Sequence, residues 1–424
     1  MSSCNPVLSN DLSLIAINLT RRCNLACEHC YLDADTLRDG SKDELTTEEV
    51  CRLLDEVVNC GDGTMVVLTG GEPLARRDVE TIAAYGSRLD LAMVVGTNGT
   101  LLTEQRVKSL KQSGVLGVGI SLDSLDADFH DSFRGKTGSW SKTMNGIENC
   151  RRQGLDFQIH FSISEGNNHE LDAMVNFSRS CGARVLNVFF LVCTGRGEAV
   201  TDITPSHYEQ ILNEIIDAQQ RYQDLIIRAR CAPHFKRVAW QRDPNSALNR
   251  ISGKEADGCI AATHYCRITP EGGVTACPYI SNEAGNIRQQ TFSEIWNSAT
   301  EFELLRNPVL SGSCGACEFR QLCGGCRARS VANGQGLMDE DPICKYIPGT
   351  GDVIQPIQEG DYNDINWSQE AEQRLSRIPS FLRRLVKKRA EAYVFELGEN
   401  MVTPEHLSIL AAKRFGNSRP NHPE

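Results

Sequence analysis

Three cysteines, Cys23, Cys27 and Cys30, lie close together in the run RCNLACEHCY at residues 22–31. Thiolates are the usual ligands of iron–sulfur clusters, and four of them occupy all the irons of a four-iron cluster. A C-x3-C-x2-C spacing supplies only three ligands. The spacing therefore predicts a four-iron cluster with one open iron, to which a substrate or a cofactor can bind.

Zinc is the alternative occupant of this site, because a C-x2-C pair also occurs in zinc sites. Zinc normally takes four ligands, and a fourth ligand is not apparent here. The nearest other cysteines are Cys4, Cys51 and Cys60, and none of them has a ligand-like spacing. The pattern favours iron.

Four further motifs follow the triad in a fixed order: Gly70-Gly-Glu-Pro73, Thr97-Asn-Gly99, Ser121-Leu-Asp123 and Arg134. Together with the triad, they resemble the radical S-adenosylmethionine (SAM) family. The resemblance implies that SAM chelates the open iron and is cleaved to a 5′-deoxyadenosyl radical. It also implies that the Gly-Gly-Glu-Pro motif binds the methionine amino group and that Arg134 binds the SAM carboxylate. The residues implied to bind this cofactor are Gly70, Gly71, Glu72, Pro73, Thr97, Asn98, Ser121, Asp123, Arg134 and Leu191.

The first half of the chain alternates short apolar runs with amphipathic stretches. The predicted strands are 14–18, 65–68, 92–95, 118–120, 157–163 and 185–191, and the predicted helices are 46–58, 77–88, 103–113, 141–153 and 170–181. Continuous apolar strands with helical crossovers predict an α/β fold with a parallel sheet covered by helices. Six such units predict a partial (β/α)6 barrel like that of the family. The motifs above fall at the carboxyl ends of the strands, where such folds bind ligands.

A second group of cysteines occupies residues 259–344, in the order Cys259, Cys266, Cys277, Cys314, Cys317, Cys323, Cys326 and Cys344. Eight thiols suit two four-iron clusters, one cluster with spare thiols, or two zinc sites. The region resembles the SPASM extension of radical SAM enzymes, whose Cys–Gly–Cys element fits Cys266, Gly272 and Cys277. Many SPASM proteins have three residues between the cysteines that match Cys323 and Cys326, whereas this chain has two. We therefore expect one or two auxiliary clusters.

The run CGACEFRQLCGGC at residues 314–326 resembles the radical SAM enzymes of tetrapyrrole biosynthesis, which make haem and haem d1. This resemblance implies an enzyme that modifies the propionate or acetate side chains of a tetrapyrrole. The alternative is a SPASM maturase that modifies a peptide. An iron–sulfur electron carrier is hard to reconcile with the SAM-binding motifs. As partners, we expect the substrate and an electron donor such as flavodoxin or ferredoxin.

Cys231 lies outside both cysteine groups, in the run Cys231-Ala-Pro-His234, which also resembles the tetrapyrrole enzymes. A partly exposed thiol at this position could donate a hydrogen atom or bind a substrate metal, which makes Cys231 the candidate catalytic residue. A buried thiol beside a turn is the alternative.

The end of the chain differs in composition from the rest. Residues 347–366 are rich in Gly, Pro, Asp and Asn and predict a linker. Residues 367–416 are similar to the small C-terminal domain of the light-independent protochlorophyllide reductase B subunit. Five basic residues there, Arg383, Arg384, Lys387, Lys388 and Arg389, form either a solvated helix face or a carboxylate-binding patch. The predicted domains are thus 13–200 (barrel), 201–346 (SPASM type), 347–366 (linker) and 367–416 (helical).

Composition limits the remaining functions. The chain has 424 residues and a net charge of −11, which argues against general binding of nucleic acids. No apolar run approaches the length of a membrane span, and the first residues lack the features of a signal peptide. Eighteen cysteines in a large chain without an export signal predict a reducing, cytoplasmic location rather than disulfides.

Overall fold

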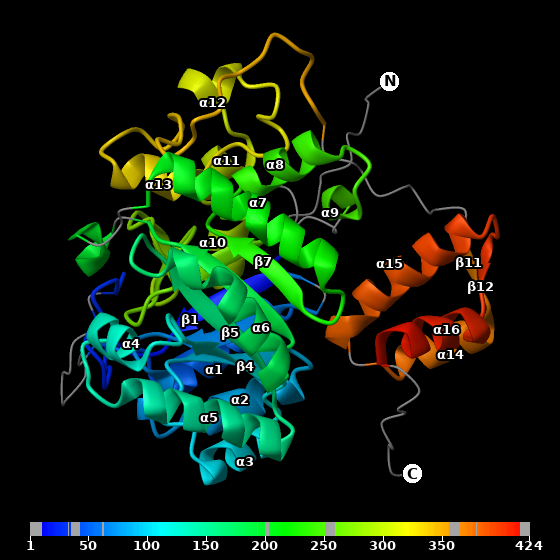
Figure 1. Ribbon diagram of the computed structural model, residues 1–424. Helices are drawn as coiled ribbons and strands as arrows, with labels where there is room; N and C mark the ends of the chain where they lie inside the picture. The colour runs from blue at the N-terminus through cyan, green and yellow to red at the C-terminus, as the bar shows by residue number, and fades with distance from the viewer. Residues whose placement is uncertain are drawn as a thin grey trace. The chain divides into compact units, whose positions relative to one another are not determined.

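The structure is a computed structural model, which describes residues 11–32, 34, 43–61, 63–192, 194–199, 203–250, 259–355, 365–378 and 380–415 (Figure 1). The chain forms two compact units, Met1–Ile357 and Gln358–Glu424. The boundary between them falls within the predicted linker, part of which lies outside the described residues. None of the described helices is long and apolar enough to cross a membrane.

The first unit is built on one ten-stranded sheet, in which seven consecutive strands are parallel neighbours in chain order. They are β1 (Leu14–Asn18), β2 (Met65–Thr69), β3 (Ala92–Thr97), β4 (Gly117–Ser121), β5 (Asp156–Ile163), β6 (Val185–Phe190) and β7 (Ile226–Arg230). Beyond β1 the sheet continues with β8 (Tyr265–Ile268), β9 (Gly273–Thr275) and β10 (Glu283–Asn286). Of these, β8 runs parallel to β1, and β9 and β10 are antiparallel to their neighbours.

Helices connect the parallel strands and pack around them (Figure 1). They are α1 (Thr47–Val57), α2 (Val79–Arg88), α3 (Glu104–Gln112), α4 (Ala127–Phe133), α5 (Ser139–Gln153), α6 (Leu171–Cys181), α7 (Pro205–Arg221) and α8 (His234–Arg242). Short helices follow: α9 (Ala247–Arg250), α10 (Phe292–Ser298), α11 (Thr300–Arg306), α12 (Gly312–Ala316) and α13 (Arg327–Ala332). The short 3-10 turns are η1 (Pro73–Ala75), η2 (Asn168–Glu170) and η3 (Gly195–Ala199).

Local sequence explains where the elements begin. Thr46 caps α1, since its side chain accepts the N–H of Glu49 while the Glu49 carboxylate accepts the N–H of Thr46. Apolar residues from both the strands and the helices form one continuous core, which includes Ile17, Val95 and Phe161. This core supports the sheet whose carboxyl edge carries the predicted motifs.

The predicted α/β class with a parallel, helix-covered sheet is confirmed. The strand β7 was not predicted, because its sequence IIRAR alternates arginines with apolar residues and is not a continuous apolar run. The short helix α4 was also not predicted. The boundary predicted at position 200, between the barrel and the SPASM-type domain, stays a prediction. Strands from both sides of this position belong to the same sheet.

The second unit is a small helical unit with its own core. It contains β11 (Asn366–Trp367), α14 (Gln369–Ser376), α15 (Ser380–Glu396), β12 (Met401–Val402) and α16 (Pro404–Phe415). The buried residues of its core are Ala371, Ala390, Val394, Val402 and Leu407. A core of this size leaves the unit only marginally stable.

We predict that Leu407→Ala unfolds this second unit. Leu407 is 5% exposed, and truncation of a buried leucine costs about 2–5 kcal/mol. Ile409 lies on the same helix and is 41% exposed, so Ile409→Ala is the matched control and should change stability by less than about 0.5 kcal/mol. Hydrogen exchange of the amides in residues 365–415 measures both effects, and equal loss of protection in the two variants would contradict the assignment of this core.

Candidate functional site

The cysteine triad lies in the loop after β1, at the carboxyl edge of the parallel sheet. Burial raises the pKa of Cys23 to about 12, and the nearby Cys27 and Cys30 add to this shift. Each sulfur accepts a hydrogen bond: Cys23 from the Leu25 N–H, Cys27 from Arg134 Nη1 at 3.7 Å, and Cys30 from the Ala34 N–H at 3.4 Å. Buried thiols with N–H donors suit an iron–sulfur cluster, whose ligands are deprotonated on binding.

The glycines of the Gly-Gly-Glu-Pro motif bring the end of β2 into contact with the triad loop. Gly70 has a φ of +133°, and a Cβ atom added there would lie 2.6 Å from the Thr20 carbonyl oxygen. A Cβ atom added to Gly71 would lie 2.3 Å from the Arg22 carbonyl oxygen. The Gly71 N–H donates to Thr20 O at 2.7 Å, and the Glu72 N–H donates to Arg22 O at 2.8 Å. Any side chain at these two positions would therefore displace the loop that carries the triad.

Glu72 joins the ends of β2 and β3. Its fully buried carboxylate accepts hydrogen bonds from Leu74 N at 3.0 Å, Thr97 Oγ1 at 2.8 Å and Asn98 N at 2.9 Å. Burial raises the pKa of Glu72, although these hydrogen bonds oppose the shift. Asn98 in turn donates to Asn24 Oδ1 at 2.9 Å, next to Cys23. Glu72 thus positions the strand ends, and its predicted contact with SAM stays a prediction.

The remaining motif residues also lie at this edge of the sheet. Pro73 begins η1, Ser121 is the last residue of β4, and Leu191 follows β6 and is buried. Their predicted contacts with the cofactor stay predictions.

Asp123 and Arg134 form a buried ion pair beside Cys27. Arg134 Nη2 lies 2.5 Å from Asp123 Oδ2, and the two side chains are 7% and 0% exposed. Burial opposes both charges, but their mutual attraction lowers the pKa of Asp123 and raises the pKa of Arg134 above its usual value. In this structure the guanidinium binds Asp123 and the Cys27 sulfur, and its predicted contact with the SAM carboxylate stays a prediction.

Arg196 is a site residue that the sequence analysis missed. Its Nε atom donates to the Cys27 carbonyl at 3.0 Å, Nη1 donates to the Ala34 carbonyl at 3.0 Å, and its N–H donates to the Cys30 carbonyl at 3.2 Å. Gly195 has a φ of +57° and packs against the same loop. The Gly-Arg-Gly run after the sixth strand was the available signal, because conformationally free glycines flank a cation there.

Four of the later cysteines share one cavity. The cysteines that line it are Cys314, Cys317, Cys323 and Cys344, and His234 and Arg237 also line it. Arg327 Nη2 lies 3.7 Å from the Cys314 sulfur, and the Asp341 N–H donates to it at 3.4 Å. This cavity therefore offers a complete set of four thiols.

A second set of thiols comes together nearby and includes Cys231. The thiol of Cys277 is close enough to those of Cys231, Cys259 and Cys326 for each of them to raise its pKa, although burial is the larger cause. The Tyr279 hydroxyl donates to the Cys231 sulfur, and the Tyr279 ring lies 5.7 Å from that of Tyr31, next to Cys30. Cys231 is therefore linked to the triad loop through the contact between Tyr279 and Tyr31, and its thiol lies near those of three later cysteines.

Cys266 is separated from these two sets. It lies in β8 with no exposed surface and packs in the main core. Burial raises the pKa of Cys266, and the neighbouring thiol that adds to this shift is Cys60, from the end of the α1 segment. Cys266 was predicted as a metal ligand, and this position does not favour that role.

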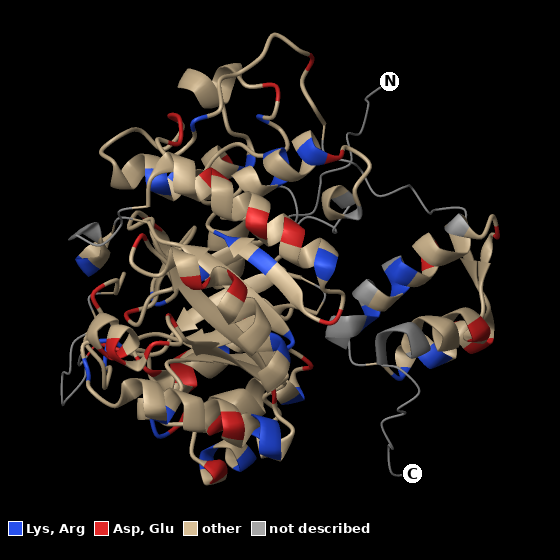
Figure 2. Ribbon diagram, in the orientation of Figure 1, with Lys and Arg blue, Asp and Glu red and all other residues tan. Residues whose placement is uncertain are grey.

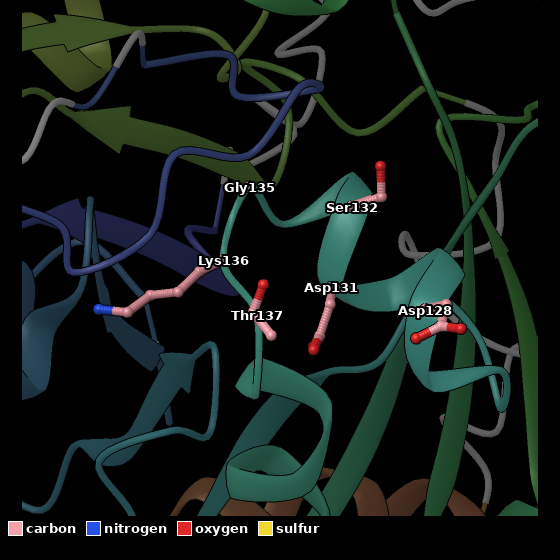
Figure 3. A pocket seen from close by; sticks show the side chains of 6 residues that line it. All are labelled: Asp128, Asp131, Ser132, Gly135, Lys136 and Thr137. Atoms are coloured by element: carbon pink, nitrogen blue, oxygen red, sulfur yellow. The ribbon is translucent and has the colours of Figure 1, made fainter.

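A pocket beside the loop that follows Arg134 is lined by Asp128, Asp131, Ser132, Gly135, Lys136 and Thr137 (Figure 3). Lys136 points away from Asp131 and Asp128 in this view, and its Nζ atom donates to the Asn24 carbonyl at 3.1 Å. Asp131 accepts hydrogen bonds from Ser139 Oγ at 2.8 Å and Trp140 N at 2.7 Å, at the start of α5. The polar groups of this pocket therefore brace the loop between α4 and α5.

Among the described residues, no three His, Cys, Asp or Glu side chains converge as they would on a single metal ion. A zinc site requires all its sulfur ligands within about 2.3 Å of one point. A four-iron cluster spreads its thiolates over four metal atoms, so wider sets of cysteines fit it better than they fit zinc.

Family models match three regions of the chain. Residues 17–178 match the Radical SAM superfamily, and residues 259–318 match the iron-sulfur cluster-binding domain SPASM. Residues 367–410 match the Proto-chlorophyllide reductase 57 kD subunit. An AdoMet-dependent heme synthase of Methanosarcina barkeri is 39% identical over 349 residues, which cover 81% of this chain and 99% of that relative. The chain belongs to the radical SAM superfamily.

Other relatives match over similar lengths. An AdoMet-dependent heme synthase of Nitratidesulfovibrio vulgaris is 35% identical, over 79% of this chain and 92% of the relative. Mycofactocin maturase MftC of Mycolicibacterium smegmatis is 30% identical, over 81% of this chain and 86% of the relative.

Two solved structures of proteins with bound S-adenosylmethionine (AdoMet) have the same fold. Streptococcus suis SuiB bound to S-adenosylmethionine matches with a TM-score of 0.65 at 17% identity, over 80% of this chain and 78% of that chain. The anSMEcpe protein with bound AdoMet matches with a TM-score of 0.59 at 18% identity, over 78% and 90%. At these identities the likeness shows the fold alone.

This radical SAM protein is therefore an enzyme, with a four-iron cluster that binds SAM and one or two auxiliary iron–sulfur clusters. The predicted resemblance, enzyme class and cofactors are confirmed. The residues that hold these cofactors stay predictions.

We predict that Asp123→Ala strongly destabilises the iron-free chain, because it leaves the Arg134 guanidinium buried without its carboxylate. Removal of one partner of a buried ion pair costs about 3–5 kcal/mol. The control is Glu148→Ala in the Arg151–Glu148 pair, whose side chains are 56% and 47% exposed, and it should cost only ~0–1 kcal/mol. Denaturation of both variants in guanidinium gives the two free energies of unfolding, and similar values would rule out a structural role for the Asp123–Arg134 pair.

Proposed function

We propose that this enzyme acts in haem-type tetrapyrrole biosynthesis, where it modifies propionate or acetate side chains of a porphyrinoid. The observation that carries the proposal is the 39% identity to an AdoMet-dependent heme synthase over 99% of that relative. Relatives with the names Fe-coproporphyrin III synthase and Pre-heme d1 synthase, at 28% and 30% identity, support the same substrate class.

In this proposal Cys23, Cys27 and Cys30 hold the cluster that binds SAM, and the later cysteines hold auxiliary iron. When bound, SAM and its cluster supply a radical that abstracts a hydrogen atom, and an auxiliary cluster supplies an acceptor for one electron. A propionate that loses one hydrogen atom, one electron and carbon dioxide becomes a vinyl group. The work of the protein is to bind the propionates, orient them and exclude water.

The strands β5 to β7 carry a row of polar side chains on one face. In the strand register His160 lies opposite Asn187, and Asn187 lies opposite Arg228. Residues opposite each other on paired strands share a face of the sheet. The adjacent residues Val188 and Ile227 face the other way, into the core. Arg228 therefore lies on the face turned away from that core, and the basic positions of β7 are coloured blue in Figure 2.

Two arginines of β7, Arg228 and Arg230, make this row basic, and Arg228 is the one that can bind a ligand. Arg230 Nε donates to Asn187 Oδ1 at 2.9 Å, and Asn187 Nδ2 donates to Gln158 Oε1 at 2.7 Å. Burial, with Arg230 as the next cause, lowers the pKa of His160 to about 4, so this imidazole is neutral at pH 7. The side chain of Arg228 forms no hydrogen bond or ion pair with another described residue. A partly buried guanidinium without a carboxylate is suited to bind a substrate propionate.

A peptide substrate is the second candidate. The identity of 30% to mycofactocin maturase MftC favours it, and SuiB bound to its precursor peptide has the same fold. The larger identity to the heme synthases makes the tetrapyrrole the better-supported substrate. An electron donor such as flavodoxin or ferredoxin remains a prediction.

Two basic residues of the second unit have partners within that unit. Arg383 Nε donates to the Ile378 carbonyl at 2.6 Å and Nη2 donates to the Ser376 carbonyl at 2.9 Å, at the end of α14. Lys387 Nζ lies 4.0 Å from Glu391 Oε1. The side chains of Arg384 and Lys388 lie outside the described residues. The match to the Proto-chlorophyllide reductase 57 kD subunit is the observation that links this unit to tetrapyrroles.

We predict that simultaneous replacement of Cys23, Cys27 and Cys30 by alanine reduces SAM cleavage to background while auxiliary iron remains bound. The reason is that the later cysteines belong to separate sets of thiols. Chromatographic measurement of 5′-deoxyadenosine, with iron analysis, checks both parts. Replacement of Cys51 and Cys181 by alanine is the control and should leave deoxyadenosine formation intact. Normal cleavage by the triad variant would refute the assignment.

We predict that Arg228→Gln weakens binding of an iron coproporphyrin about tenfold or more, because a charge-assisted hydrogen bond contributes about 1.5–3 kcal/mol. Titration followed by the porphyrin absorption band gives the Kd. Arg184→Gln, at an arginine whose side chain is 65% exposed, is the control and should bind normally.

The methyl ester of the same porphyrin tests whether the contact is to a propionate. The ester should bind the unaltered enzyme more weakly than the free acid does, and Arg228→Gln should cause little further loss. Equal Kd values for the free acid in both proteins would remove Arg228 from the substrate site and favour the peptide alternative.

A further inference from the structure

The later cysteines number eight, but the structure divides them into sets of four, three and one. Cys314, Cys317, Cys323 and Cys344 line a single cavity. Cys259, Cys277 and Cys326 form another group, and Cys266 lies apart in β8. Two fully ligated four-iron clusters require eight thiolates, so the group of three lacks one ligand.

Cys231 lies near this group of three cysteines. It follows the last residue of β7, and a chain of hydrogen bonds joins it to Cys326. Arg329 Nη2 donates to the Cys231 carbonyl at 2.8 Å, and Arg329 Nη1 donates to Asp341 Oδ2 at 2.9 Å. The Cys326 N–H donates to the same Asp341 oxygen at 2.7 Å. Each of these bonds involves the buried side chain of Arg329 or Asp341, so the backbones of the two cysteines are held in a defined arrangement.

The backbone at Cys231 is unusual in a way that this arrangement explains. Its φ is +57°, in the left-handed region that residues with a Cβ atom rarely adopt. Such strained conformations persist when the surroundings hold them, and they are concentrated at functional sites. Here Arg329 holds the carbonyl of Cys231, and the Tyr279 hydroxyl donates to its sulfur.

The other members of the group are held in a similar way. The Arg327 N–H, next to Cys326 in the chain, donates to the Cys259 sulfur. Cys277 follows β9, and Thr275 Oγ1 donates to its carbonyl at 3.1 Å. The thiols of Cys231, Cys259 and Cys326 all act electrostatically on Cys277, which requires them to lie close to it.

Cys266 does not meet the same conditions. Its strand position is opposite Ile15 of β1, and its thiol lies beside Cys60 and the Arg306 guanidinium. To reach the other three cysteines, Cys266 would have to leave the hydrophobic core and break the pairing of β8 with β1.

We propose that Cys231 is the fourth ligand of an auxiliary four-iron cluster held by Cys259, Cys277 and Cys326, and that Cys266 is not a ligand. The enzyme then carries two auxiliary clusters, each with four cysteines. The cluster that includes Cys231 is attached to the sheet through β7. Asp341 contacts both sets of cysteines, because its carboxylate accepts the Cys326 N–H and its own N–H donates to the Cys314 sulfur. This inference depends on the iron–sulfur cofactors and not on the tetrapyrrole substrate.

The test uses full-length protein in which Cys23, Cys27 and Cys30 are alanines, so that all bound iron belongs to the auxiliary clusters. This background should bind about eight irons per chain. Adding Cys231→Ala should lower the value to about four, or to about seven with the EPR signal of a three-iron cluster. Adding Cys266→Ala, the matched control, should leave about eight irons and an unchanged EPR spectrum of the reduced clusters.

A second variant keeps the test decisive if Cys231→Ala does not fold, as judged by circular dichroism. Cys231→Ser offers an oxygen ligand, which should retain the cluster and lower the reduction potential of one auxiliary cluster only, as followed by EPR during a redox titration. The proposal is overturned if both Cys231 variants keep the iron content and potentials of the background, or if Cys266→Ala loses iron. A background with only about four irons would also overturn it.

Discussion

Buried arginine–aspartate pairs organise both cysteine-bearing parts of the first unit. Arg134 pairs with Asp123 and reaches the Cys27 sulfur, whereas Arg329 pairs with Asp341 and reaches the Cys231 carbonyl. A buried charge is tolerated only when it is paired and hydrogen-bonded, so each pair holds its surroundings in one arrangement. The two pairs therefore help to position Cys27 in the triad loop and Cys231, Cys314 and Cys326 in the later region.

The parallel sheet joins the two cysteine-bearing parts of the first unit. The ends of β1 to β4 hold the triad loop through backbone contacts that only glycines permit at positions 70 and 71. The same sheet continues through β7, which ends at Cys231, and through β8 and β9, which lead to Cys277. One sheet therefore carries cysteines of both the SAM site and the auxiliary region. The arginines of β7, Arg228 and Arg230, lie between these two regions in the chain.

Much of this arrangement was predictable from short patterns. The triad, the strand-end motifs and the first six strands were identified because each depends on residues close together in the chain, such as an apolar run that ends at a glycine pair. The strand β7 was missed, since its alternating arginines and apolar residues do not form the continuous run expected of a buried parallel strand. Arg196 was missed because its partners, the carbonyls of Cys27 and Ala34, are more than 150 residues away in the sequence.

The sequence by itself determined the fold class, the family and the kinds of cofactor, because spacing and hydrophobic period are local properties of the chain. Only the tertiary structure decided how the cysteines divide into sets. The spacing of Cys266 matches a family motif, yet its side chain is buried in the hydrophobic core. Cys231 stands outside every spacing pattern, yet its strand ends beside Cys326. Distances between thiols depend on which strands pair and which side chains are buried, and these properties are settled by long-range packing.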